Sequence, residues 1–217
     1  HDFNKSSGYN HERAAESNRR WHLWRNRLKK MRVAILGAFS NLSDTYSVAR
    51  VASEQLRAFM HEGVDCRMWT LDNLKLDEIP QDLRECVKPV IRPKKMVDDV
   101  VDTTRSDSYA ADILTAFRDY EPTHVITHDL LFQASHIDFA KAVHDLEPMT
   151  RSACWFHYLH SSVHGSDGEK AVPVWRRSLP EAHFLVYPTQ ADTSLVAKRY
   201  NTSPKRVYAC PNVHDPR

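Results

Sequence analysis

Histidine side chains near the ends of two apolar segments are the residues best suited to do chemistry. His128 is followed directly by Asp129, and His157 and His160 lie three residues apart. A neutral imidazole donates and accepts hydrogen bonds, and a carboxylate accepts them from hydroxyl groups. We therefore expect His160 to bind a sugar hydroxyl or a phosphate at an edge of the fold. His128 is a second candidate there, and Asp129 either accepts from a substrate hydroxyl or caps a following helix.

The thirteen histidines also raise the possibility of a metal site. His157, His160 and His164 are spaced three and four residues apart, a spacing that can hold zinc on a helix. However, His157 falls in a predicted strand, and no cysteine or carboxylate lies in this window before Asp167. We therefore predict that the protein holds no metal.

Composition and missing motifs exclude several functions. The 217 residues are 41% hydrophobic and 27% charged, as in ordinary globular proteins. No run of about 18 apolar residues occurs, so no membrane-spanning helix is expected. The five glycines form neither a GxGxxG loop nor a P-loop, and HExxH, GxSxG and Asp-x-Asp are also missing. Four cysteines without a CxxC pair predict free thiols and a cytoplasmic location.

Residues 1–30 form a basic leader ahead of a mildly acidic body. The leader holds eight Lys or Arg against three acids, whereas residues 31–217 hold 22 basic and 25 acidic residues. In a helix over residues 19–30, Trp21, Trp24 and Leu28 fall on one side. We expect this side to contact an anionic membrane surface or, alternatively, to pack on the protein itself. Nucleic-acid binding is disfavoured because the body is acidic.

Apolar runs alternate with amphipathic patterns through residues 31–217, which we treat as one domain. Runs typical of buried strands cover 31–39, 65–71, 87–91, 124–128, 153–159, 183–188 and 206–211. Helical spacing covers 48–63, 109–120, 133–146, 173–179 and 191–200. This alternation predicts an α/β fold, a Rossmann-like open parallel sheet with helices on both faces.

Residues that follow each predicted strand are candidates for binding, because open parallel sheets bind ligands outside the carboxyl ends of their strands. Gly37, Ala38 and Ser40 follow the first strand and precede a helix. The missing side chain of Gly37 would let a ligand approach the backbone, and the helix N-terminus would favour a phosphate. The alternative for Gly37 is a tight turn without a ligand.

A set of segments in this order resembles the N-terminal domain of family-4-like glycosyltransferases of the GT-B fold. The similarity runs from Met31 to about Pro216, and its most specific part is the Pro211-Asn212-x-x-Asp215 turn near the end. That turn is similar to the one with which the family crosses into its second domain. The segments are MRVAILGAF, EGVDCRMWT, THVITHDLL, FHYLHSS, FLVYPTQADTSLVAKRY and VYACPNVHDP.

The resemblance implies one half of an enzyme that moves a sugar from a nucleotide-sugar to an acceptor hydroxyl with retention of configuration. It implies no required metal or cofactor, a carbohydrate or lipid-linked acceptor on this domain, and a donor-binding second domain with a Glu-x7-Glu motif. It places His160, and secondly His157, against the donor sugar, and residues 37–40 near the diphosphate and acceptor. The chain ends at Arg217, where that second domain would begin, so this half alone is expected to be inactive.

The sequence also departs from the family. Its first loop reads Ser40-Asn41-Leu42-Ser43, where the family often has paired glycines, and the Pro-Asn turn lacks its glycine. The alternative function is a non-catalytic Rossmann-like module that binds carbohydrate or protein.

Overall fold

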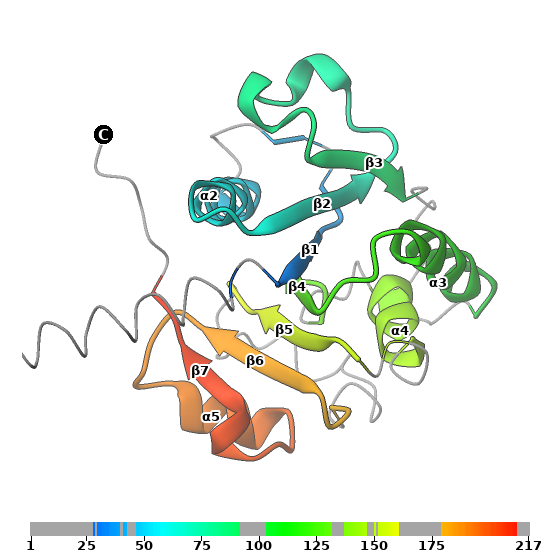
Figure 1. The fold of residues 1–217 in the computed structure, drawn as a ribbon. Helices are drawn as coiled ribbons and strands as arrows, with labels where there is room; N and C mark the ends of the chain where they lie inside the picture. The colour runs from blue at the N-terminus through cyan, green and yellow to red at the C-terminus, as the bar shows by residue number, and fades with distance from the viewer. Residues whose placement is uncertain are drawn as a thin grey trace, which may run out of the picture.

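Seven strands form one parallel sheet in the part of the chain that the structure describes (Figure 1). The structure is a computed structural model, and it describes residues 28, 30–39, 41–42, 47–91, 103–131, 137–146, 150, 152–160 and 179–211. The order across the sheet is β3-β2-β1-β4-β5-β6-β7, with every neighbouring pair parallel. The prediction of a Rossmann-like α/β fold is therefore confirmed. The strands are β1 (Arg32–Leu36), β2 (Asp65–Leu71), β3 (Val87–Ile91), β4 (His124–His128), β5 (Cys154–Tyr158), β6 (His183–Tyr187) and β7 (Val207–Ala209).

Helices cover both faces of this sheet. Figure 1 shows α2 on one face and α3 and α4 on the other. None of the described helices is long and apolar enough to cross a membrane. The helix predicted at 173–179 lies outside the described residues. The helices are α2 (Ser47–His61), α3 (Thr103–Arg118), α4 (Ile137–Asp145) and α5 (Thr193–Arg199), with short 3-10 turns η1 (Leu76–Glu78), η2 (Gln81–Leu83) and η7 (Pro204–Arg206).

Helix α3 begins earlier than the apolar spacing predicted. It begins at Thr103, whereas helical spacing was visible only from residue 109. Its first turns are rich in Thr, Ser and Asp, which are weak helix formers and carry no apolar pattern. Contacts with α4 stabilise these turns: Arg105 Nε donates to Asp138 Oδ2 at 2.6 Å, and the rings of Tyr109 and Phe139 lie 5.1 Å apart. Tertiary packing therefore extends the helix beyond its sequence signal.

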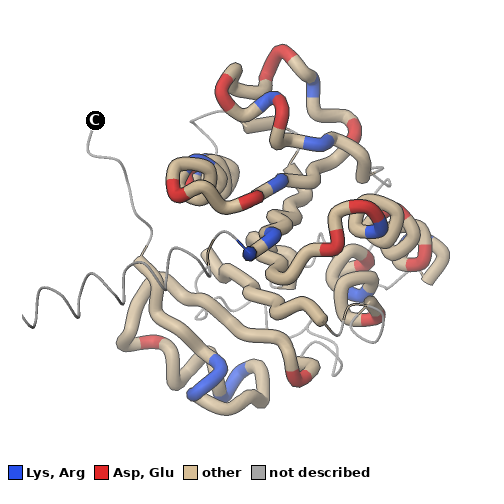
Figure 2. Tube along the Cα trace, in the orientation of Figure 1, with Lys and Arg blue, Asp and Glu red and all other residues tan. Residues whose placement is uncertain are grey.

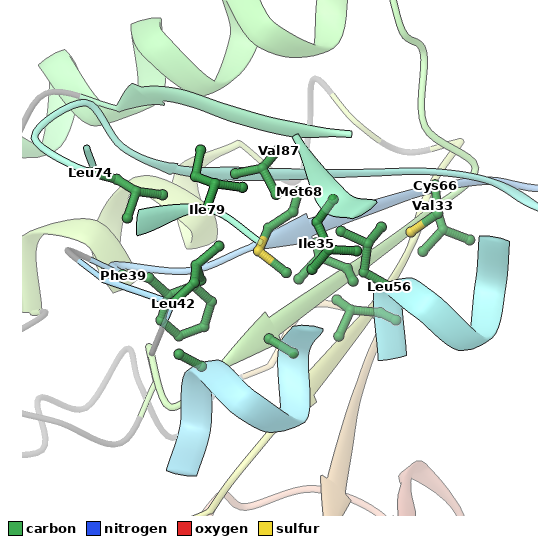
Figure 3. Close-up of a cluster of buried hydrophobic side chains, with 14 of the residues drawn as sticks. Val33, Ile35, Phe39, Leu42, Leu56, Cys66, Met68, Leu74, Ile79 and Val87 are labelled. Atoms are coloured by element: carbon green, nitrogen blue, oxygen red, sulfur yellow. The ribbon is translucent and has the colours of Figure 1, made fainter. Parts of the chain in front are cut away.

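Apolar layers hold the helices against the sheet. On one face, α2 packs on β1 and β2 through a cluster that includes Ile35, Leu56 and Met68 (Figure 3). On the other face, α3 and α4 pack around Trp155, and α5 packs on β6 and β7 through Val196. Strands β4, β5 and β6 contain no Lys, Arg, Asp or Glu, and the described charged residues lie on helices, connections and strands β1 to β3 (Figure 2). Buried charge is costly, which accounts for this distribution.

Tyr120 links the end of α3 to the first two strands. Its side chain is 4% exposed, and its hydroxyl lies 2.8 Å from the carbonyl oxygen of Asp65 and 3.0 Å from that of Val33. Burial raises the pKa of Tyr120, and the charge of Asp65 raises it further, so the hydroxyl keeps its proton. The Tyr120 hydroxyl therefore donates to strand backbone at the point where α3 ends.

We expect Tyr120→Phe to lower the free energy of unfolding by about 1 kcal/mol, because it removes a buried hydrogen-bond donor and keeps the ring. Urea denaturation followed by circular dichroism measures the change. Tyr208→Phe is the matched control, because Tyr208 is 48% exposed and its loss of a hydroxyl should cost less than about 0.5 kcal/mol. Equal losses in the two variants would contradict the assigned role of Tyr120.

Candidate functional site

The strand order reverses between β1 and β4, which lie next to each other in the centre of the sheet. Open α/β sheets bind their ligands outside the carboxyl ends of the strands at such a switch point. Here the segment 37–39 follows β1, Asp129 follows β4, and His160 lies two residues beyond the end of the neighbouring strand β5. The topology therefore brings the first loop and two of the three candidate histidines, His128 and His160, to one region of the sheet edge.

His128 and His160 form a hydrogen-bonded pair at this edge. The Nδ1 atom of His128 lies 2.8 Å from the Nε2 atom of His160. Their rings are stacked, with centroids 5.1 Å apart and an interplanar angle of 16°. One ring donates the hydrogen of this bond and the other accepts it, which requires at least one neutral imidazole. The sequence named both residues separately, and the structure shows that they form one unit.

Asp129 positions His160 through the backbone. Its Oδ1 atom accepts a hydrogen bond from the backbone N–H of His160 at 2.7 Å, and its own N–H donates to the carbonyl oxygen of Tyr158 at 2.8 Å. Asp129 has a φ of 55°, which is uncommon for a residue other than glycine. Because α4 begins at Ile137, Asp129 is not the N-cap of that helix. The observed contact with His160 is a role that the sequence did not predict.

The histidine pair is uncharged at neutral pH. His128 is 2% exposed, and its ring stacks on Tyr158, with centroids 5.3 Å apart. Burial lowers the pKa of His128, and neighbouring His160 lowers it further. Burial also lowers the pKa of His160, although the charge of Asp129 acts in the opposite direction. Two neutral imidazoles suit the binding of uncharged hydroxyl groups better than the binding of an anion.

One nitrogen of this pair has no partner in the described part of the chain. The Nε2 atom of His128 is buried and makes no hydrogen bond there. Buried polar atoms are nearly always hydrogen-bonded, and exceptions occur at functional sites. Because His128 is the last residue of β4, this nitrogen belongs to the edge where a ligand is expected. The amino-acid sequence does not show that this nitrogen is buried and unpaired.

The ring of Phe39 occupies the space left by the missing side chain of Gly37. A Cβ atom at Gly37 would lie 2.1 Å from Cε2 of Phe39 and 2.5 Å from Cδ2. Phe39 is 2% exposed, and its ring lies 6.1 Å from that of His128. Gly37 is therefore needed to seat Phe39 beside the histidine pair, and the approach of a ligand to its backbone stays a prediction. Ala38 packs toward the α3 side of the sheet.

His157 lies in a different environment from His160. Its Nδ1 atom is 2.8 Å from Thr127 Oγ1 and its Nε2 atom is 2.9 Å from Nδ1 of His183. All three side chains are buried, on β4, β5 and β6. Both ring nitrogens of His157 are therefore engaged inside the protein, and none is left for a substrate. We omit His157 from the site and keep His160.

His183 is a buried histidine that sequence reasoning did not single out. Its ring stacks on Trp155 with centroids 5.3 Å apart and an interplanar angle of 13°. Burial lowers the pKa of His183 to about 3, with further lowering by His144 and Arg206. The pKa of His157 is lowered by burial, by His183 and by Arg206. The sequence signal for His183 is its position at the start of the apolar strand β6. That position does not distinguish a buried histidine from an exposed one.

Other predicted site residues are either outside the described residues or packed elsewhere. Ser40, Trp21 and Trp24 lie outside the described part of the chain. Leu28 is described, half-buried, and packed against the apolar cluster under α2. Within the described residues, no group of three or more His, Cys, Asp or Glu is arranged to hold a metal ion. The four cysteines, which the structure describes, are free thiols.

A hollow of about 400 Å³ lies at the opposite, amino-terminal edge of the sheet. Arg32, Arg118 and Glu121 are among the residues that line it, and Arg32 Nη2 lies 3.5 Å from Glu121 Oε2. The hollow adjoins the C-terminal end of α3, whose free carbonyl groups disfavour an anion. We place the candidate site at the carboxyl edge instead, because the topological switch point between β1 and β4 lies there.

Two sequence comparisons with known proteins give no match. No model of a known protein family matches the chain, and a search of curated proteins finds no similar sequence. The assignment of a function therefore depends on the sheet edge itself and on the resemblance noted in the sequence.

We expect Gly37→Ala to destabilise the protein by about 1–3 kcal/mol, because the added methyl group overlaps the ring of Phe39. Chemical denaturation of Gly37→Ala, Phe39→Ala and the double variant measures this coupling. The glycine substitution should cost much less in the Phe39→Ala background, where the ring is gone. If the cost of Gly37→Ala were the same in both backgrounds, Phe39 would not be the reason for the glycine.

We expect stability to fall as the pH is lowered below about 6.5, the ordinary pKa of histidine. His128, His157 and His183 have lowered pKa values in the folded state. The unfolded chain therefore binds more protons in acid, and this binding stabilises it relative to the folded state. For His183 this window extends from about pH 6.5 down to about pH 3. Urea denaturation at a series of pH values measures the effect.

His183→Gln and His61→Gln are a matched pair for this measurement. The side chain of His61 is 86% exposed at the end of α2, so its replacement should leave the slope of stability against pH unchanged. His183→Gln should reduce that slope by about 1.4 kcal/mol per pH unit between pH 6 and 4, which corresponds to one proton. A slope that is the same in wild type and His183→Gln would show that His183 does not contribute.

Proposed function

We propose that this chain is the acceptor-side domain of a retaining glycosyltransferase, which transfers a sugar from a nucleotide-sugar to an acceptor hydroxyl. The observation that carries this proposal is the neutral His128–His160 pair at the switch point of a Rossmann-like sheet. The co-linear resemblance to the GT-B family supports it independently of the geometry. In this proposal the chain supplies one wall of the active site, and a second domain supplies the donor-binding wall.

The histidine pair suits sugar recognition because it is neutral and held in place. Carbohydrate hydroxyl groups both donate and accept hydrogen bonds, as neutral imidazoles do. Asp129 fixes the backbone of His160, and Phe39 and Tyr158 pack around the His128 ring. Such support keeps a donor or acceptor atom in one position, which is a condition for stabilising a transition state. His160 is the half-buried member of the pair, so we assign the contact with sugar to it.

The remaining chemistry belongs to groups outside this chain. In retaining transfer without a metal, backbone amides and basic side chains hold the leaving diphosphate, and the acceptor hydroxyl attacks on the face from which the diphosphate leaves. Asp129 is hydrogen-bonded to the backbone of His160, so we do not assign it the role of a general base. The donor-binding domain and its Glu-x7-Glu motif are required to complete this proposal. An acceptor attached to a lipid at a membrane surface is compatible with it.

The coding sequence that follows Arg217 gives the first test. We expect it to encode a second α/β domain with a Glu-x7-Glu motif. A stop codon at that point would contradict the catalytic proposal and favour a non-catalytic module that binds carbohydrate or protein.

In the protein that contains both domains, we expect His160→Ala to lower turnover by about 100-fold, the size typical of losing one positioned hydrogen-bond donor. Nucleotide affinity should stay close to wild type, because in this proposal the second domain binds the nucleotide part of the donor. Sugar transfer to a panel of glycan acceptors measures turnover. His61→Ala is the control, since His61 ends α2 at the opposite edge of the sheet and should keep full activity. Unchanged turnover in His160→Ala would remove the role assigned to it.

A further inference from the structure

The hydrogen bond between His128 and His160 limits how the two rings can be protonated. It joins Nδ1 of His128 to Nε2 of His160 at 2.8 Å. A neutral imidazole carries one N–H group and one bare nitrogen, so two arrangements are possible. In the first, His128 donates from Nδ1, and His160 carries its own hydrogen on Nδ1. In the second, His160 donates from Nε2, and His128 carries its hydrogen on Nε2.

The burial of His128 favours the first arrangement. Its Nε2 atom is buried and has no hydrogen-bond partner in the described part of the chain. The second arrangement would place an N–H group at this position, whereas the first leaves a bare nitrogen there. In protein backbones, buried N–H groups without an acceptor are rarer than buried carbonyl groups without a full set of donors. The same preference favours a bare nitrogen on the buried side of His128.

The carboxylate of Asp129 favours the same arrangement. Its Oδ1 atom accepts a hydrogen bond from the backbone N–H of His160 at 2.7 Å. Of the two ring nitrogens of His160, Nδ1 is covalently nearer to that backbone, so a negative charge there favours a hydrogen on Nδ1. Burial lowers the pKa of His160, and the charge of Asp129 opposes this effect, which agrees with a carboxylate that attracts the imidazole hydrogen.

The Nδ1 atom is the nitrogen of His160 that a ligand can reach. The other ring nitrogen, Nε2, is engaged by His128. Within the described residues Nδ1 makes no hydrogen bond, and unlike Nε2 of His128 it is not enclosed, since His160 is only half-buried. An N–H group at this position binds an oxygen atom that accepts, whereas a bare nitrogen binds a hydroxyl group that donates.

We propose that His128 is a positioning residue that holds His160 in its Nδ1–H form, so that His160 donates a hydrogen bond to an oxygen atom of the sugar. The first half of this proposal concerns the present chain alone, and the second half rests on the proposed function. The sugar oxygen accepts from His160, so a hydroxyl group bound there keeps its own hydrogen for another partner.

Nitrogen-15 NMR of the 217-residue chain, labelled at histidine, tests the tautomer. Long-range proton–nitrogen correlation spectra at neutral pH distinguish protonated from bare imidazole nitrogens. The signals of His160 are identified by their loss in His160→Gln, a change at a half-buried side chain. We expect a protonated Nδ1 and a bare Nε2 in His160, and the same in His128. A bare Nδ1 and a protonated Nε2 in His160 would overturn the proposal.

His128→Asn and His128→Leu are matched in size and differ in hydrogen bonding. The amide nitrogen of Asn can donate to Nε2 of His160, as Nδ1 of His128 does, and Leu cannot. His160 should therefore keep its Nδ1–H form in His128→Asn and become a mixture of tautomers in His128→Leu. Circular dichroism checks that both variants fold, and if His128→Leu does not, the wild-type spectrum decides. An unchanged tautomer in folded His128→Leu would show that His128 does not set it.

Turnover of the protein that contains both domains tests the second half. His128→Leu should lower sugar transfer by about tenfold, the lower end of what loss of a histidine's supporting partner costs at metal sites. His128→Asn should restore most of the turnover, and His61→Leu, at an 86% exposed side chain, is the control that should change nothing. Full turnover in His128→Leu would overturn the positioning role. If wild type transferred no sugar, the proposed function would be wrong, and the NMR spectra would still decide the tautomer.

Discussion

The parallel pairing of all seven strands is the constraint on which the other features of the structure depend. Parallel neighbours are joined by crossovers, and these crossovers place helices on both faces of the sheet. Strands β4, β5 and β6 lie inside the sheet and are largely buried, and they contain no Lys, Arg, Asp or Glu. Most polar side chains on these strands find at least one hydrogen-bond partner inside the protein. Histidine is the main polar side chain that meets this condition here.

The histidines of the sheet illustrate how one residue type serves two purposes. On the face of α3 and α4, hydrogen bonds join Thr127, His157 and His183 into a row across three strands, which ends at the unpaired Nε2 atom of His183. On the other face, His128 reaches the carboxyl edge and bonds to His160, and one of its nitrogens stays unpaired in the described structure. Alternation along β4 places neighbouring Thr127 and His128 on opposite faces, and this single step separates a structural histidine row from a candidate site.

The edge of the sheet is held together by contacts between different strand ends. Asp129, beyond β4, bonds to the backbone of His160, beyond β5, and Phe39, beyond β1, packs near His128. Gly37 leaves the space that this ring requires. The proposed glycosyl transfer depends on this support, because a neutral imidazole recognises a hydroxyl group well only when its position is constant.

The sequence by itself determined the class of the fold and most element positions. Apolar runs of five to seven residues, separated by amphipathic segments, predicted strands such as β2 and β4 that agree with the structure at both ends. This worked because buried parallel strands require continuous apolar residues. The apolar spacing did not show the first turns of α3, since those turns depend on the contact between Arg105 and Asp138 from two different helices. Gly37, His128, Asp129 and His160 were identified as candidates from their places after predicted strands.

Only the tertiary structure decided what these candidates do. Strand order makes β4 and β5 neighbours, and that adjacency pairs His128 with His160 and brings the carboxylate of Asp129 to a backbone N–H 31 residues away. The same order engages both nitrogens of His157 with Thr127 and His183, residues 30 and 26 positions away. Hydrogen bonds of this kind are set by register and face, which no local pattern encodes. The sequence determined where polar groups interrupt the apolar strands, and the packing of those strands determined which of them satisfy one another.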